Sequence, residues 1–303
     1  MGFAANQGGT CAVAAMRRLV HRSDARPLIG FLLATSVGGL VCLPVAWLLG
    51  GRAHLPVVAD VGVGLLTGSA LLGVGAFVNG ACLLGSLWRL GNGESRLLAL
   101  PLGLSFGYLV ATRLAPFLLP AGRAAPRPSF GIADLLLVGA FLLIALAALV
   151  WLSSREGDLP PGRWRLTTSM IVIGASGALL FAVQPGWSYA DAIRRGVAPP
   201  MLMMLAGSGG LVAALATVVG AITSAATSRA FALHRPRFRD IARSVVGGSL
   251  MAFGAALVPG GNDALLLAGI PSGSASAMVA FATMNATILL LVAIGSVRTV
   301  GNH

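Results

Sequence analysis

The chain has 303 residues, of which 56% are hydrophobic and only 10% are charged. Soluble domains carry roughly 25% charged residues, so this composition excludes an ordinary soluble protein and indicates an integral membrane protein. The net charge of +12 comes from 21 arginines against nine carboxylates, and no lysine occurs. The arginines fall in short segments between apolar runs, where they orient spans, and we therefore expect no nucleic-acid partner.

Eight apolar stretches, most of them reaching the roughly 20 residues that a bilayer-spanning helix needs, follow a basic N-terminal segment. They cover residues 28–49, 57–90, 97–112, 130–152, 166–187, 201–228, 245–270 and 276–297. We predict an all-α, polytopic helical membrane protein with about 8–9 spans. Residues 1–27 are expected to form a cytoplasmic basic tail, and residues 28–303 a single transmembrane domain within the lipid bilayer.

The second stretch, residues 57–90, is too long for one straight span. Its 34 residues would make a helix of about 51 Å, against a hydrocarbon core of roughly 30 Å. The natural break is Asn79-Gly80, after which residues 82–90 are predicted to form a half-helix that ends at Gly-Asn-Gly, residues 91–93. A re-entrant turn at this break would raise the number of segments from eight to nine.

An internal repeat relates the two halves of the chain at a separation of 180 residues. It places the Gly80 break in register with Gly260, and it covers about 26 residues. Repeat one is centred on residues 62–110, and repeat two on residues 242–290. The same register pairs further small residues: Gly68 with Gly248, Ser69 with Ser249, and Gly93 with Gly273.

The distribution of arginines predicts the orientation of the spans. Fifteen arginines fall in one alternating set of connecting segments and six in the other, so both termini are predicted to face the cytoplasm across a bacterial-type inner membrane. The second and seventh spans then run in opposite directions. The two repeats are therefore predicted to be inverted and pseudo-symmetric, with their Gly-broken half-helices meeting near the midplane, where transporters hold their substrates.

Catalytic and metal-binding patterns are absent from the sequence. Cys11, Cys42 and Cys82 are too far apart in the chain for a CxxC redox or zinc motif. We therefore expect no enzyme activity, no metal and no cofactor. The four histidines fall in tails or loops: His21, His54, His234 and His303.

Cys82 follows the first break, where the N–H groups of a starting helix point outward. A thiol at this position is suited to contact a soft substrate, although cysteine also packs in membrane helices as a small hydrophobe. The packing interpretation is the stronger one for Cys42. Together with Asn79, Gly80 and Ala81, we regard Cys82 as a candidate substrate-binding residue.

The matching candidates in the second copy are Gly260, Gly261, Asn262 and Asp263. The Gly-Gly backbone and a helix N-terminus together form an anion cradle that needs no basic side chain. Asn262 is suited either to cap the half-helix or to bind a ligand. A carboxylate at Asp263 would cost several kcal/mol at this depth, so it needs a partner or a proton, and a structural cap and a proton-coupling role both fit it.

These residues resemble the YeeE/YedE family of sulfur-transport membrane proteins, whose repeats carry a Gly-rich half-helix with a Gly-x-Cys core. The first copy reads GVGAFVNGACLLG over residues 73–85, and the second reads GAALVPGGNDALLLAGIPS over residues 254–272. The resemblance implies uptake of thiosulfate or a related sulfur species along a path lined by thiols, with Cys82 in that role. The chain departs from the family at Asn262, where well-studied members carry a second cysteine.

We therefore expect a permease for a small sulfur-containing anion such as thiosulfate, with the path lined by Cys82 and the two breaks. Two alternatives remain open: a membrane-embedded sulfur- or selenium-handling protein that uses Cys82 as a persulfide carrier, and a permease subunit that needs a partner. The sequence contains no sulfurtransferase-like soluble domain. The expected cytoplasmic acceptor of sulfur is therefore a separate protein.

Overall fold

The computed structural model describes residues 1–50, 57–58, 60–118, 123–124, 131–157, 162–184, 187–197, 209–258 and 260–300. The side chains of residues 57–58, 115–118, 123–124 and 297–300 are not described. Residues 201–208 of the sixth predicted stretch, together with His54 and His303, lie outside this set.

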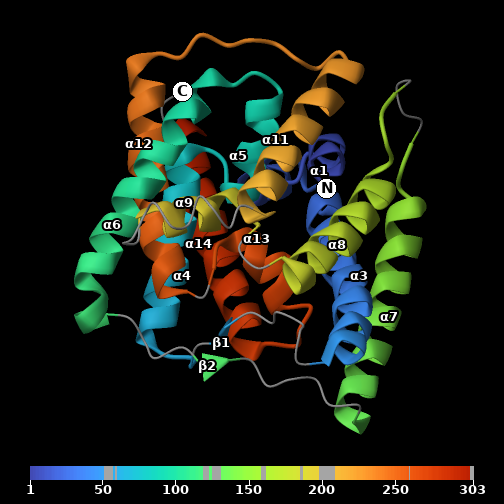
Figure 1. Ribbon diagram of the computed structural model, residues 1–303. Coiled ribbons are helices and arrows are strands. Elements are labelled where there is room, and N and C mark those ends of the chain that lie inside the picture. Colours follow the sequence, from blue (N-terminus) through green and yellow to red (C-terminus); the bar gives the residue numbers. More distant parts are fainter. Residues whose placement is uncertain are drawn as a thin grey trace.

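The described chain is helical apart from one short antiparallel pairing of β1 (Val57–Val58) with β2 (Arg123–Ala124) at one end of the molecule (Figure 1). The helices before the middle of the chain are α1 (Gly2–Gly8), α2 (Ala12–Arg22), α3 (Arg26–Leu49), α4 (Val63–Asn79), α5 (Leu83–Gly91), the 3-10 helix η2 (Ser95–Ala99), α6 (Leu100–Leu118) and α7 (Ile132–Ser153). Those that follow are α8 (Leu166–Val183), α9 (Tyr189–Val197), α11 (Gly209–Thr227), α12 (Phe238–Leu257), α13 (Asn262–Ala264), the π-helix η3 (Leu265–Gly269) and α14 (Ala275–Val300).

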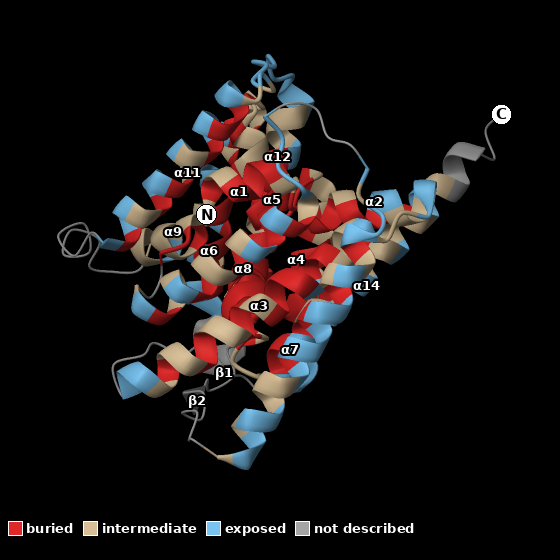
Figure 2. Ribbon diagram, turned by 90° about the vertical axis from the view of Figure 1, so that its right-hand side faces the viewer, coloured by how far each residue is buried: buried red, intermediate tan, exposed pale blue. Residues whose placement is uncertain are grey.

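Eight segments of the described chain are long and apolar enough to cross a membrane, which confirms the multi-pass, all-α prediction. Large apolar side chains are exposed along the outer faces of these segments. In α7, only 22% of the apolar stretch that could cross the membrane is buried inside the protein. In water such a surface would be unfavourable, whereas lipid chains solvate it well. Figure 2 shows the buried residues gathered at the centre of the bundle and the exposed ones along its outer helices.

The first 22 residues differ from the expected tail, because they form two helices and α1 is packed inside the helical body. α1 contacts α11, α8 and α5. Its small residues allow a close approach: a Cβ on Gly2 would lie 1.8 Å from the Thr217 carbonyl oxygen. Asn6 and Gln7 are buried and bind Asn92 and Ser224 through their side chains. The sequence held a signal for this, since charged residues first occur at Arg17.

Glycines bring the equivalent helices of the two repeats, α4 and α12, into direct backbone contact. A Cβ on Gly75 would lie 2.6 Å from the Met251 nitrogen, and one on Gly254 would lie 2.5 Å from the Gly68 oxygen. As residue numbers rise along α4, the numbers of their α12 neighbours fall, so the two helices run antiparallel. Small residues at such interfaces let membrane helices pack closely.

The third helix of each repeat packs against the first helix of the other repeat. α6 lies against α12, where Gly103 faces the Val245 carbonyl, and α14 lies against α4, where Gly73 faces the Met284 carbonyl. In this reciprocal exchange the first helix of each repeat is covered by the third helix of the other, and α4 and α12 are antiparallel. This packing directs the starts of the half-helices α5 and α13 toward each other, inside the bundle.

Candidate functional site

The first break lies between α4 and α5, and each of its residues has a distinct task. Gly80 has φ 78°, in the left-handed region that favours glycine, and this conformation ends α4. Cys82 is extended and caps α5, because its sulfur accepts a hydrogen bond from the Gly85 N–H at 3.3 Å. The break thus leaves the first N–H groups of α5 without partners in their own helix backbone and places a thiol beside them.

The second break meets the first one directly. Gly260 has φ 101°, and α13 begins at Asn262 after Gly261. The Asn262 side-chain oxygen accepts a hydrogen bond from the Leu83 N–H at 3.1 Å, so an amide from repeat two caps the half-helix of repeat one. A Cβ on Gly261 would lie 2.5 Å from Leu83, which shows how closely the breaks approach. We call this meeting point, residues 79–83 and 260–263, the junction.

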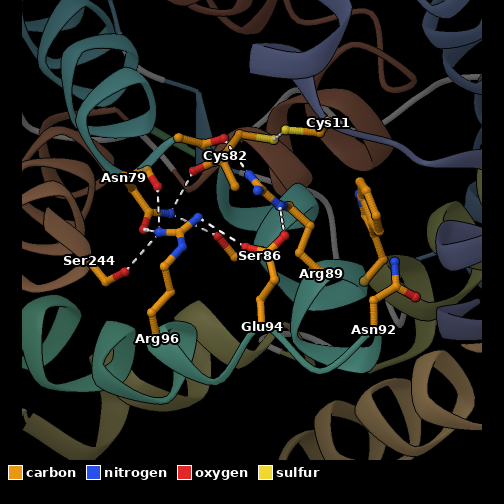
Figure 3. A network of polar contacts seen from close by, with 12 residues as sticks. Cys11, Asn79, Cys82, Ser86, Arg89, Asn92, Glu94, Arg96 and Ser244 are labelled. Atoms are coloured by element: carbon orange, nitrogen blue, oxygen red, sulfur yellow. Dashed lines mark hydrogen bonds and ion pairs between the residues drawn. The ribbon is translucent and has the colours of Figure 1, made fainter. Parts of the chain in front are cut away.

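Cys11 supplies a second thiol at the junction. Its sulfur lies 4.0 Å from that of Cys82, and the Ala12 N–H donates to the Cys82 sulfur at 3.4 Å (Figure 3). Both cysteines are only 2% exposed. A Cβ on Gly85 would overlap the Cys11 sulfur at 2.5 Å, so a glycine on α5 makes room for this thiol.

Sequence reasoning missed Cys11 as a site residue, although the chain carries a usable signal. Gly9-Thr10-Cys11 repeats the Gly-x-Cys pattern of residues 80–82, and Gly9 has φ 57° just as Gly80 is left-handed. Each cysteine is then the N-cap of the helix that follows it, α2 or α5. Cys42, the third cysteine, lies buried on α3 and forms no hydrogen bond to the junction among the described residues.

A further helix start, that of α9, contacts the junction from its other side. The Ser188 oxygen accepts a hydrogen bond from the Asp191 N–H at 3.2 Å and so caps α9. The Tyr189 hydroxyl donates to the Leu83 carbonyl oxygen at 2.8 Å. Helix starts from four separate parts of the chain, those of α2, α5, α9 and α13, therefore converge on the region around Leu83.

Two arginines hold the carbonyl groups that the first break leaves without helical partners. Arg96 donates to the Asn79 carbonyl oxygen at 2.7 Å, and Arg89 donates to the Gly80 carbonyl oxygen at 2.7 Å. Both arginines also pair with Glu94, at 3.2 Å and 2.5 Å (Figure 3). Cations at the C-terminus of α4 complement its dipole, so this cluster stabilises the kinked backbone. The sequence offered no spacing pattern from which to predict it.

Replacing Arg96 with methionine is expected to destabilise the break by about 1–3 kcal/mol, because the buried Asn79 carbonyl loses its charged donor. The contact that Arg96 makes with Ser244 of α12, at 3.1 Å, would be lost as well. The measurement is the thermal unfolding midpoint in detergent. Arg239→Met removes an exposed arginine and serves as the control. An unchanged midpoint for the Arg96 variant would contradict this role.

The junction combines thiols, amides and helix N-termini, and the Arg89 and Arg96 side chains hold the carbonyl groups of Gly80 and Asn79. No cluster of three or more His, Cys, Asp or Glu side chains suited to a metal occurs in the described residues. Asp263 is 3% exposed beside Asn262. The arrangement is thus suited to bind a small anion through N–H and S–H groups rather than to perform metal-assisted chemistry.

Comparison with known proteins agrees with this geometry. A family model described as sulphur transport matches residues 7–290, which include both breaks and Cys11. No curated protein matches the chain. The matched range covers most of the chain, and the family is a transport family. The chain therefore belongs to the sulphur-transport family, the YeeE/YedE family, and is a multi-pass membrane protein.

Proposed function

We propose that the protein carries a small sulfur-containing anion, such as thiosulfate, across the membrane through the junction. One observation supports this most directly: the sulfur atoms of Cys11 and Cys82 lie 4.0 Å apart at the converging starts of α2 and α5. Polarisable thiols suit a substrate with a terminal sulfur. Helix N-termini favour negative charge, so the starts of α2 and α5 suit an anionic substrate.

In this proposal the two thiols act in succession. An arriving anion accepts S–H and N–H hydrogen bonds at one cysteine and is then handed to the other, with Asn262 as the remaining polar contact. All three residues are nearly fully buried, so the described state is closed on both sides. Passage requires the two half-helices to separate, and the Leu83–Asn262 hydrogen bond is the direct contact that this movement would break.

The orientation in the membrane is part of the proposal. Arg17, Arg18 and Arg22 lie on α2, and the segment between α11 and α12 exposes a further group of arginines. By the positive-inside rule, both features belong on the cytoplasmic side of a bacterial inner membrane. A separate sulfur acceptor protein would then receive the substrate there.

The proposal is tested with purified protein in liposomes and radiolabelled thiosulfate. We expect uptake well above that of protein-free liposomes, with competition by unlabelled thiosulfate but not by chloride, because the site selects a soft sulfur atom. Liposomes that contain an unrelated membrane protein control for leakage. No uptake above that control would contradict the proposal. A gain of one sulfur atom in mass at Cys82 without uptake would instead support the persulfide carrier.

A further inference from the structure

Asp263 is a buried acid of the junction to which the proposed handover between the two thiols gives no role. It lies in the first turn of α13, is 3% exposed, and its Oδ1 atom has no hydrogen-bond partner. Oδ1 points back toward the break, since a Cβ on Gly261 would lie 2.6 Å from it. An unpaired buried carboxylate oxygen is costly, so its presence at the junction calls for an explanation.

Among the described residues, the cavity beside Asp263 is lined by polar and apolar groups and by no arginine. Asp263 lines this small cavity of about 10 Å³ together with Trp187, Ser188, Tyr189 and Thr217. The Trp187 indole nitrogen is also buried without a partner. The remaining lining side chains are apolar: Leu84, Leu87 and Ala214.

The titratable groups around Asp263 come from three elements. α9 contributes Tyr189, Asp191 and Arg194, α6 contributes Tyr108, and α5 begins at Cys82. Arg194 is the one cation in this set, and it pairs with Asp191 at 3.5 Å. Asp191 adds a like charge to the surroundings of Asp263. Within the described residues no arginine forms an ion pair with Asp263, so a bound proton would relieve the cost of an uncompensated buried charge.

Resting on the proposed function, we propose that Asp263 is the proton-binding site that couples anion uptake to the proton gradient. When the junction faces the outside, the carboxylate takes a proton from water and forms an O–H bond. When the junction faces the cytoplasm, that bond breaks and the proton leaves with the anion. No oxidation or reduction takes place.

Energetics provide the reason for such a site. Moving one negative charge into a cell against a negative-inside potential costs about 2.3 kcal/mol per 100 mV. A co-transported proton offsets one of those charges. It also removes the repulsion between an ionised Asp263 and an anion at the neighbouring Asn262.

A larger cavity adjoins the site. Leu87, Tyr189 and Ala214 line both the small cavity and a larger one of about 310 Å³ between α5, α6, α9 and α11. A dehydrated metal cation suits the small cavity poorly, because about 10 Å³ holds a single water at most and the indole N–H of Trp187 is a donor.

The test uses wild-type protein in liposomes that are acidic outside and loaded with a pH-sensitive dye. We expect thiosulfate to acidify the interior, and a gradient of one pH unit to raise accumulation about tenfold for one proton per anion. The Asp263→Asn variant should lose most of the tenfold rise in accumulation that the pH gradient produces. Its exchange of internal for external thiosulfate should stay measurable. Asp263→Glu should restore the gain, because it restores the carboxyl group.

Asp240→Asn, which removes a carboxylate from the first turn of α12, is the matched control and should behave as wild type. If thiosulfate accumulation by the wild-type protein does not change with the pH gradient, or depends on a sodium gradient instead, the proposed proton coupling is wrong. Full gradient-driven accumulation by the Asp263→Asn variant would overturn it as well. Absence of even wild-type exchange would overturn the proposed function, whereas exchange without a pH effect overturns the coupling alone.

Discussion

Replacing Cys82 with serine is expected to lower thiosulfate uptake at least about tenfold, the effect of losing roughly 1.4 kcal/mol of stabilisation in the rate-limiting step. Serine is close to cysteine in shape and is a strong N-cap, so the Gly85 N–H keeps its acceptor and α5 keeps its start. What the variant loses is the polarisable sulfur beside Cys11. The measurement is the initial rate of labelled uptake in liposomes at matched protein density.

Cys42→Ser is the matched control for this variant. Cys42 is 3% exposed, comparable to the 2% of Cys82, but it lies on α3 outside the junction. We expect its uptake to stay within about twofold of wild type, since a helical serine can bond to the preceding turn. Equal uptake by the Cys82 variant and wild type would remove the thiol from the transport path.

Replacing Gly75 with alanine is expected to cost roughly 1–3 kcal/mol of stability and to loosen the bundle at its centre. The added Cβ would lie 2.6 Å from the Met251 nitrogen and 2.7 Å from the Gly247 carbonyl oxygen. Both are backbone atoms, which cannot rotate away as a side chain does. α4 and α12 must therefore move apart, and the junction at the end of α4 moves with them.

Gly64→Ala provides the control on the same helix, because a Cβ there has no neighbour within 4 Å. Where a helical Cβ meets open space, alanine is favoured over glycine by about 0.5–1 kcal/mol, so this variant should be as stable as wild type or more stable. Thermal unfolding of both variants in the same detergent distinguishes the two effects. Equal midpoints would show that the α4–α12 contact tolerates an extra methyl group.

The α1–α2 segment shows why the candidate site was only partly predictable. An arginine-rich N-terminus before a first span is typical of a cytoplasmic tail, and residues 1–27 were interpreted in that way. In the structure α1 is held by Asn6, Gln7 and its small residues, and this contact brings Cys11 to the junction. These two polar side chains find their partners across more than 80 residues of sequence, a relation that local patterns do not contain.

The sequence by itself determined the membrane class, the spans and the location of both breaks. These features depend on local properties: an apolar run long enough for the bilayer, and glycines that adopt left-handed backbone conformations at Gly80 and Gly260. The 180-residue repeat also made Cys82 and Asn262 candidates for one site, because related halves place equivalent residues around a common axis.

Only the tertiary structure decided which side chains share that site. It placed Cys11 beside Cys82, assigned Asn262 as the cap of α5, and left the Asp263 Oδ1 atom without a hydrogen-bond partner among the described residues. The physical reason is that such neighbours depend on helix packing. Close contacts such as that of Gly75 with α12 set the distance between helices, and this distance decides which distant residues meet.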